Sequence, residues 1–178
     1  MDYDQLYKEC QSEFPTFNMR KKRDSLLMKN IDKALKILTF GKMKSFLTSY
    51  ITTIGTTVWV TDNWETYHAN VKYEILSHEM VHMRQARTLG LVLYSILYLF
   101  IPIPFGFAWF RAKFEMQAYE ESMRVVYRAH GIDSLTNPLY KARIVGHFTG
   151  PDYGWMMPFK STVEKWYDGV VDKIRNGE

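Results

Sequence analysis

The fold of this chain is decided by the stretch Ser77-His78-Glu79-Met80-Val81-His82-Met83-Arg84-Gln85. Its two histidines are four residues apart, so on a helix both imidazoles lie on one face, one turn apart, where two ring nitrogens can reach one metal ion. Glu79 stands beside the first histidine, and its carboxylate can reach a metal-bound water without binding the metal itself. This spacing is typical of zinc sites in which a glutamate acts as general base.

The residues around this stretch predict an amphipathic helix from Tyr73 to about Leu89. One broad face at helical spacing holds Ile75, Leu76, Glu79, His82 and Met83. The apolar neighbours would set the histidines in a partly buried helix, and only 5 His occur in the whole chain, which favours a functional pair. The alternative is an ordinary amphipathic helix with two histidines near its polar boundary.

A catalytic zinc ion needs three protein ligands and one open position for water. Two histidines leave one ligand to be found. The downstream residues with suitable side chains are Glu115, Glu120, Glu121, His130 and His147. Residue types and spacing alone do not choose among them.

The segment Phe114-Glu115-Met116-Gln117-Ala118-Tyr119 resembles the Glu-x-x-Ala-Asp segment of gluzincin metallopeptidases of the CAAX prenyl protease type. It is also similar to the Glu-x-Glu-Ala-Tyr version in small bacterial metallopeptidase-like proteins. The run Ser77 to Gln85 is similar to their H-E-x-V-H-x-x-Q pattern, and Gly55-Thr56-Thr57-Val58-Trp59-Val60 looks like their upstream strand. The resemblance covers roughly residues 50 to 160.

The resemblance implies a zinc-dependent peptidase that hydrolyses a peptide or protein substrate. His78, His82 and Glu115 would be the Zn²⁺ ligands and Glu79 the general base. The sequence departs from the prenyl protease pattern at Tyr119, where an acidic residue supports a ligand in that family. The alternatives for Glu115 are a surface carboxylate, or replacement by Glu120 on another face of the same helix.

Peptide hydrolysis passes through a tetrahedral oxyanion, which needs a hydrogen-bond donor besides the metal. We expect this donor to be Tyr153 or His147, in the segment Gly146-His147-Phe148-Thr149-Gly150-Pro151-Asp152-Tyr153-Gly154-Trp155. A turn-rich segment of this kind is suited to lining a cleft. The alternative is a structural turn with aromatic packing.

The rest of the pattern predicts an α+β fold, zincin-like and mainly helical, with a small β-sheet or hairpin before the metal-binding helix. Helices are expected over residues 1–14, 24–38 with Asp24 as cap, 108–129 and 161–174. Residues 46–60 are rich in β-branched and aromatic side chains and predict strands divided at Gly55, whereas residues 135–158 are expected to be turn-rich. We expect a single domain over 1–178, with a helical N-terminal extension at 1–45 and the zincin-like core at 46–178.

Residues 88–110 carry no charge. Pro102 and Pro104 interrupt them, and a membrane crossing would separate His82 from Glu115, so an out-and-back hairpin turning near residues 101–106 is expected. Two alternatives stay open for residues 89–110, burial in the core and peripheral contact with a membrane.

The formal net charge of +4 arises partly from the run Arg20-Lys21-Lys22-Arg23. No fingerprint of a nucleic-acid module accompanies this run, so a solvated helix face is the better interpretation and no nucleic-acid partner is expected. The single cysteine, Cys10, and the lack of an apolar leader predict a cytoplasmic location, with membrane association as the alternative. A zinc-binding protein without proteolytic activity is the second functional hypothesis.

Overall fold

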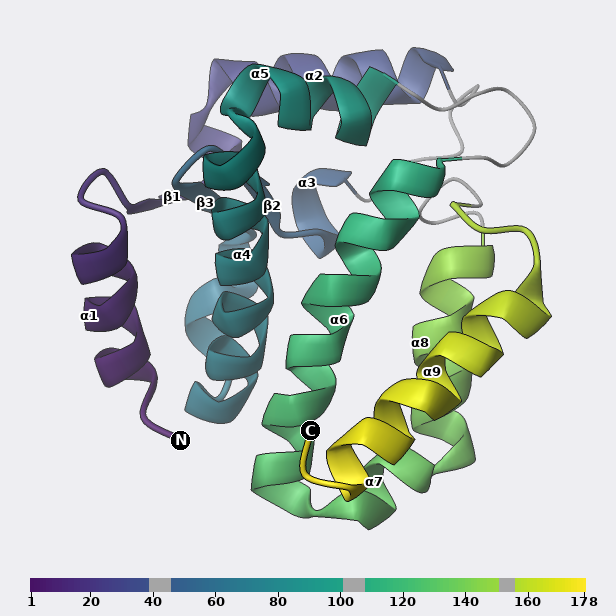
Figure 1. Cartoon of the computed structure of the whole chain (residues 1–178). Helices are drawn as coiled ribbons and strands as arrows, with labels where there is room; N and C mark the ends of the chain where they lie inside the picture. The colour runs from purple at the N-terminus through teal and green to yellow at the C-terminus, as the bar shows by residue number, and fades with distance from the viewer. Residues whose placement is uncertain (39–45, 101–107, 151–155) are drawn as a thin grey trace. The chain divides into compact units, whose positions relative to one another are not determined.

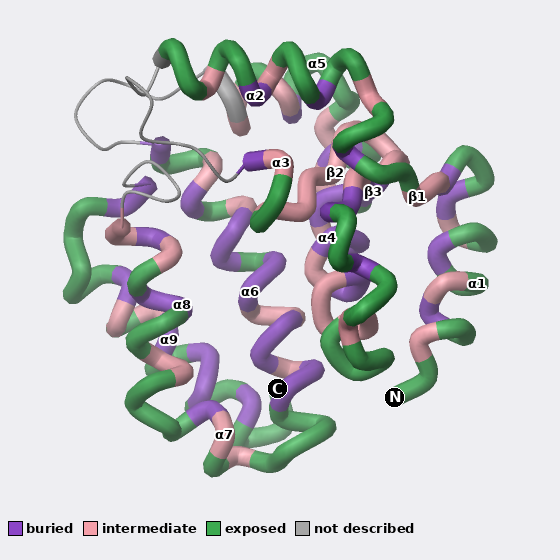
Figure 2. The backbone as a smooth tube through the Cα atoms, turned by 180° about the vertical axis from the view of Figure 1, so that it is seen from behind, coloured by how far each residue is buried: buried purple, intermediate pink, exposed green. Residues whose placement is uncertain are grey.

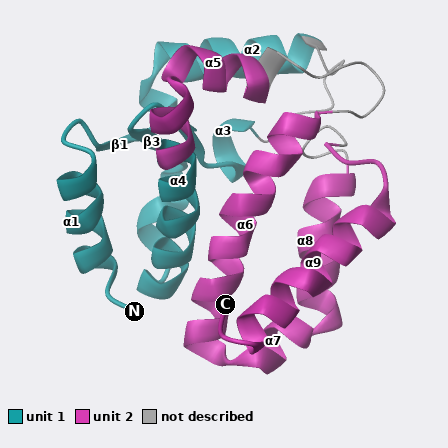
Figure 3. Ribbon diagram, in the orientation of Figure 1, with its two compact units in different colours: residues 1–83 teal, residues 84–178 magenta. Residues whose placement is uncertain are grey.

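The computed structural model describes residues 1–38, 46–100, 108–150 and 156–178 (Figure 1). The chain divides into two compact units, Met1–Met83 and Arg84–Glu178 (Figure 3). The boundary falls within one helix, α4 (Ala69–Leu89), which carries the two histidines. Most of the described residues are helical, and one small sheet accompanies the helices, as an α+β fold requires.

Unit 1 contains a three-stranded sheet in the order β1-β3-β2. β1 (Asn18–Lys21) pairs in parallel with β3 (Thr57–Val60), and β2 (Thr52–Ile54) pairs antiparallel with β3. Gly55 has φ 61° in the turn between β2 and β3, a conformation that glycine adopts without strain. The predicted division at Gly55 is therefore confirmed, as two strands rather than one bent strand.

Helices surround this sheet in unit 1. Before the sheet's hairpin come α1 (Tyr3–Glu13), the 3₁₀ turn η1 (Lys22–Asp24), α2 (Leu26–Leu38) and α3 (Phe46–Ser49); η2 (Asp62–Thr66) and α4 follow it. The buried apolar cluster of this unit is Leu6, Cys10, Phe14, Phe17, Val58, Val60, Trp64, Leu76, Met80 and Met83. Residues before position 46 thus share one core with β3 and α4.

The described residues of unit 2 form helices and short connections, and no strand is found among them. It comprises α5 (Leu91–Ser95), the π-helix η3 (Ile96–Phe100), α6 (Trp109–His130), α7 (Ile132–Thr136), α8 (Pro138–Thr149) and α9 (Lys160–Arg175). Along α6, buried segments alternate with exposed ones, as expected for a helix with one apolar face (Figure 2).

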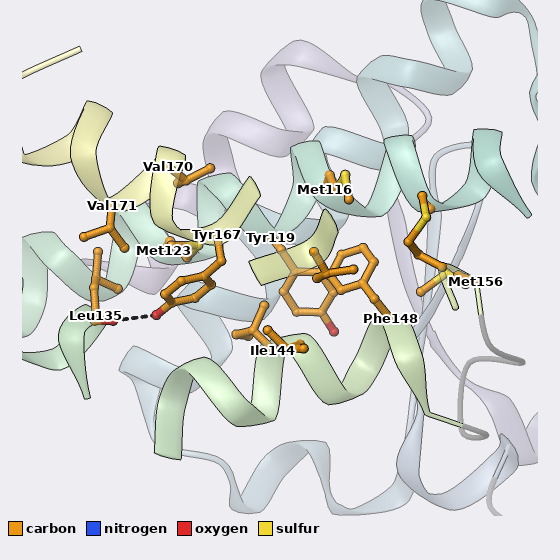
Figure 4. Packing of buried hydrophobic residues seen from close by; sticks show 14 of the residues in the cluster. Met116, Tyr119, Met123, Leu135, Ile144, Phe148, Met156, Tyr167, Val170 and Val171 are labelled. Carbon is orange, nitrogen blue, oxygen red and sulfur yellow. Dashed lines mark hydrogen bonds between the residues drawn. The ribbon is translucent and has the colours of Figure 1, made fainter. Parts of the chain in front are cut away.

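The core of unit 2 is formed by α6, α7, α8, α9 and Met156–Met157. Phe148 is fully buried, and its ring lies 5.5 Å from that of Tyr119 and 5.3 Å from that of Trp166. Tyr167 donates a hydrogen bond from its phenol to the carbonyl oxygen of Leu135 at 2.6 Å, so the polar end of this buried ring is satisfied (Figure 4).

Several predicted elements need correction. The 24–38 helix begins at Leu26, and Ser25 rather than Asp24 provides the cap, since its Oγ accepts from the amide of Met28 at 3.3 Å. Residues 46–49 are helical instead of extended. The metal helix begins at Ala69, four residues before the predicted start.

The largest error concerns residues 135–158, which were expected to be turn-rich. Pro138 stands at the first turn of α8, where its missing N–H costs nothing, and the Asn137 side chain accepts from the amide of Leu139 at 2.8 Å. These are signals for the start of a helix, and His147 therefore lies on a helix rather than on a loop. The predicted hairpin turn at 101–106 lies outside the described residues.

Among the described residues, no helix has both the length and the apolar character needed to cross a bilayer.

Candidate metal centre

The two histidines lie one turn apart on α4, as their spacing predicts. Their Nε2 atoms are 3.2 Å apart, and the ring centroids are separated by 4.9 Å. Two nitrogen ligands at zinc–nitrogen distances of about 2.0–2.1 Å in tetrahedral geometry would be roughly 3.3 Å apart. The pair therefore has the spacing that one zinc ion requires, although an N–H···N hydrogen bond between neutral rings has a similar length.

Glu79 is held by the sheet that precedes its helix. Its side chain is buried, and Oε2 accepts a hydrogen bond from Thr53 Oγ1 at 2.7 Å. Thr53 belongs to β2, whose antiparallel pairing with β3 fixes the position of its hydroxyl. One carboxylate oxygen of the predicted base thus has a partner within unit 1, which restricts rotation of the carboxylate.

A buried lysine interacts electrostatically with this carboxylate. Lys22 is fully buried; its Nζ donates to the carbonyl oxygen of Phe46 at 3.0 Å and lies 3.8 Å from the centre of the Phe46 ring. Burial lowers the pKa of Lys22 to about 7, while the negative charges of Glu79 and Asp32 act in the opposite direction. Lys22 is therefore a buried amine whose charge interacts with that of the predicted base.

Among the carboxylates described in unit 2, Glu115 is the most buried, with 2% of its surface exposed. Its Oε1 accepts a hydrogen bond from the phenol of Tyr98, which lies on the π-helix η3. Burial, together with the charge of Glu115, raises the pKa of Tyr98 well above its ordinary value. Burying a charged carboxylate to this degree destabilises the folded protein unless a proton or a cation compensates its charge.

His78, His82 and Glu115 each offer one ligand atom, and these atoms all lie within 4.8 Å of one another. Within the described ranges of the chain, no other group of three or more histidine, cysteine, aspartate or glutamate side chains meets this condition. Such a group could hold a metal ion.

Comparison of the chain with protein-family models, with curated proteins and with solved structures gives no match. Its function is therefore inferred from the chemistry of these side chains.

The other ligand candidates from the sequence have different roles in the structure. Glu120 forms an ion pair with Arg124 at 2.8 Å, and Glu121 forms one with Arg128 at 2.7 Å. His130 is the last residue of α6 and is exposed.

The two oxyanion candidates are placed differently. His147 lies in the last turn of α8, and its ring stacks on that of Tyr119 with centroids 5.6 Å apart and planes 15° from parallel. Tyr119 is four residues after Glu115, so it lies one turn further along the same face of α6. Tyr119 thus lies on the face of α6 that carries Glu115 and stacks on His147. Tyr153 lies outside the described residues.

Sequence reasoning missed Thr53, Tyr98 and Lys22. Thr53 and Tyr98 lie in β-rich and apolar stretches, whereas Lys22 belongs to the basic run from Arg20 to Arg23, which was expected to be a solvated helix face. That expectation is wrong at Lys22, which is fully buried, and Arg20 and Lys21 lie on the strand β1. A tyrosine buried among apolar residues needs a hydrogen-bond partner for its hydroxyl, and this requirement was the available signal for Tyr98. For Thr53 and Lys22 the sequence carried no comparable signal, because β-branched residues and lysine are ordinary in strands and on surfaces.

Proposed function

We propose that this protein is a zinc-dependent peptidase in which His78, His82 and Glu115 hold Zn²⁺ and Glu79 is the general base. The observation that carries the proposal is the group of two imidazoles and one buried carboxylate with ligand atoms within 4.8 Å of one another. A second buried carboxylate, Glu79, follows His78 directly in the sequence. Two nitrogen ligands and one oxygen ligand form a common set for catalytic zinc, and they leave a fourth position for water.

The hydrogen bonds of Gln85 support the choice of Glu115. Gln85 follows His82 by three residues on the same uninterrupted helix. Its side-chain amide donates to the carbonyl oxygen of Phe114 at 3.0 Å and to Oε1 of Gln117 at 2.8 Å. Phe114 and Gln117, which flank Glu115, thus accept hydrogen bonds from Gln85 of α4, the helix that carries the histidines.

A zinc ion at these ligands would polarise the scissile carbonyl and acidify a water molecule. Glu79 would take the proton of that water and pass it to the leaving amine nitrogen, a transfer that a carboxylate makes well when it is positioned by a hydrogen bond. Thr53 occupies Oε2 of Glu79, so Oε1 is the oxygen assigned to the proton transfer. His147 and Tyr153 are our candidates for the donor to the oxyanion.

The proposal is tested by zinc analysis and peptide cleavage on the same purified proteins. Wild type should contain close to one zinc per chain and cleave an unstructured protein such as casein. Glu115→Ala and His82→Ala should lose the metal, whereas Glu79→Gln should keep it and lose turnover, because the base is needed for proton transfer and not for binding.

Glu121→Ala is the matched control, since it removes a carboxylate of the same helix that pairs with Arg128. It should change neither zinc content nor cleavage. Zinc in the wild type that persists in Glu115→Ala would refute the ligand set. Full zinc without cleavage of any peptide by the wild type would favour a zinc-binding, non-proteolytic protein.

Contact with a lipid bilayer surface is a second proposed role, independent of the metal. Among the described residues of the uncharged stretch, six large apolar side chains are exposed: Leu91 (47%), Val92 (74%), Leu93 (48%), Ile96 (43%), Trp109 (50%) and Phe110 (38%). No aspartate or glutamate occurs from residue 80 to residue 114, whereas four arginine and lysine residues do, so this region suits an anionic membrane surface. We accordingly propose a cytoplasmic protein that reaches the membrane surface.

Flotation with phosphatidylserine-containing vesicles tests this role. Wild type should float, and a Val92→Ser/Ile96→Ser variant should float less. A wild type that stays at the bottom of the gradient at low salt would remove the membrane role and leave the peptidase proposal untouched.

A further inference from the structure

Tyr98 stands on a backbone segment of uncommon geometry. It lies in the π-helix η3 (Ile96–Phe100), which follows α5. Single π-helical turns are rare and occur often at functional sites, because the extra residue redirects a side chain that an α-helix would point elsewhere. Here the redirected phenol donates its hydrogen bond to Oε1 of Glu115.

The Tyr98 ring is supported on more than one side. The guanidinium of Arg111 lies 5.1 Å from its centre, and the ring of Tyr94 lies 5.5 Å away. Arg111 precedes Glu115 by one helical turn on α6, and the Tyr94 ring also lies 5.1 Å from that of Phe114. One supporting residue, Arg111, lies on α6 one turn before Glu115, and the other, Tyr94 on α5, packs against Phe114, which precedes Glu115. These contacts hold the phenol beside the carboxylate.

We propose that Tyr98 is the positioning residue for Glu115, and that by occupying Oε1 it makes Glu115 a metal ligand through Oε2 alone. The inference rests on the proposed metal site. Tyr98 would then contact neither the metal nor the substrate, and its hydrogen bond would determine which oxygen of Glu115 binds the metal.

The physical reason lies in the two equivalent oxygens of a carboxylate. Left to rotate, both oxygens can bind the same ion, which fills a coordination position that water needs for the reaction. A phenol is a donor at neutral pH, since its ordinary pKa is near 10, and it can satisfy one carboxylate oxygen without competing for the metal. Removing the partner of a metal ligand typically lowers metal affinity 10- to 100-fold.

The test is the zinc affinity of the full chain, measured by competition with a fluorescent zinc chelator. Tyr98→Phe removes one oxygen atom and should weaken zinc binding by roughly 10- to 100-fold. Tyr167→Phe is the matched control in the same unit, because it also deletes a buried phenol hydrogen bond, the one to Leu135. Its zinc affinity should equal that of the wild type, although its stability should fall.

A second measurement needs no variant and covers the case in which Tyr98→Phe does not fold. Wild type loaded with Co²⁺ in place of zinc should show the intense visible absorption of a four-coordinate ion. The weak absorption of a five- or six-coordinate ion would contradict the four-coordinate site that binding through one Glu115 oxygen predicts, and it would overturn the inference.

The outcomes separate the inference from the proposed function. A wild type that binds no zinc refutes the metal site and the role of Tyr98 together. A wild type that binds zinc, with Tyr98→Phe binding it equally well, refutes only the role of Tyr98. Equal weakening in Tyr98→Phe and Tyr167→Phe would show a general loss of packing and would also refute that role.

Discussion

The hydroxyl of Thr53 donates a 2.7 Å hydrogen bond to Oε2 of Glu79, and this bond joins an edge strand of the sheet to the helix that bears the histidines. The two residues are separated by 26 positions in the sequence. The short strand β2 therefore helps to orient the carboxylate that we propose as general base.

Replacing Thr53 with valine should therefore slow catalysis without releasing the metal. Valine keeps the shape of the side chain but cannot donate, and a hydrogen bond to a charged group contributes about 1.5–3 kcal/mol, so kcat should fall by roughly 10- to 100-fold. Thr53→Ser keeps the donor and should retain most of the activity. Steady-state cleavage and zinc content measured on both variants check this, and equal rates for valine and wild type would contradict it.

Metal removal should lower the stability of the wild type. A ligand that binds only the folded state at about 100 times its Kd stabilises it by about 2.7 kcal/mol, so a chelator should lower Tm by several degrees. His82→Ala should unfold at one temperature with or without the chelator. Calorimetry on both proteins gives the measurement. A wild-type Tm that changes with neither zinc nor chelator would argue against the site.

The buried Lys22 should make stability depend on pH. Its pKa is about 7 in the folded protein against 10.5 for an ordinary lysine, so the unfolded chain binds the proton more tightly between these values. The free energy of unfolding should consequently rise between about pH 7 and about pH 9.5, by on the order of 3 kcal/mol.

Urea unfolding of wild type and Lys22→Met at the two pH values measures this effect, and the methionine variant should lack the rise. Burial raises the pKa of Tyr3 and Tyr167 to about 12, so these groups reduce stability only above about pH 10, the ordinary value, and do not interfere. An equal rise in both proteins would assign it to another group.

The core of unit 2 should be sensitive to the loss of Phe148. This ring is fully buried between Tyr119 and Trp166, and truncating such a residue to alanine typically costs 3–5 kcal/mol. Phe159→Ala is the control, because 55% of that residue is exposed, and it should cost about 0.5 kcal/mol or less. Denaturant midpoints compare the two, and similar losses would disagree with the packing in Figure 4.

Helical periodicity explains which parts of the fold could be predicted from the sequence. The helices α1, α6 and α9 were predicted to within a few residues, because their apolar residues recur at helical spacing and stop signals follow them; Gly131, for example, ends α6 with φ 76°. The pairing of His78 with His82 follows from the same periodicity and needs no tertiary contact.

The elements that were missed depend on distant partners. β1 has the sequence Asn-Met-Arg-Lys, which carries no strand pattern, and it is extended because it pairs with β3 about 40 residues later. α8 was obscured by its glycine and proline, yet it buries Ile144, Val145 and Phe148 in the core of unit 2. In both cases tertiary contacts outweigh local propensity.

The sequence by itself determined that two imidazoles and a carboxylate share one helical segment, because a four-residue spacing and a neighbouring glutamate have the same geometry on every α-helix. Only the tertiary structure decided which hydroxyls donate hydrogen bonds to the two carboxylates, Glu79 and Glu115. Thr53 reaches Glu79 through the pairing of a hairpin, and Tyr98 reaches Glu115 through a π-helical turn. Such contacts join residues 26 and 17 positions apart, and no periodicity of the chain encodes them.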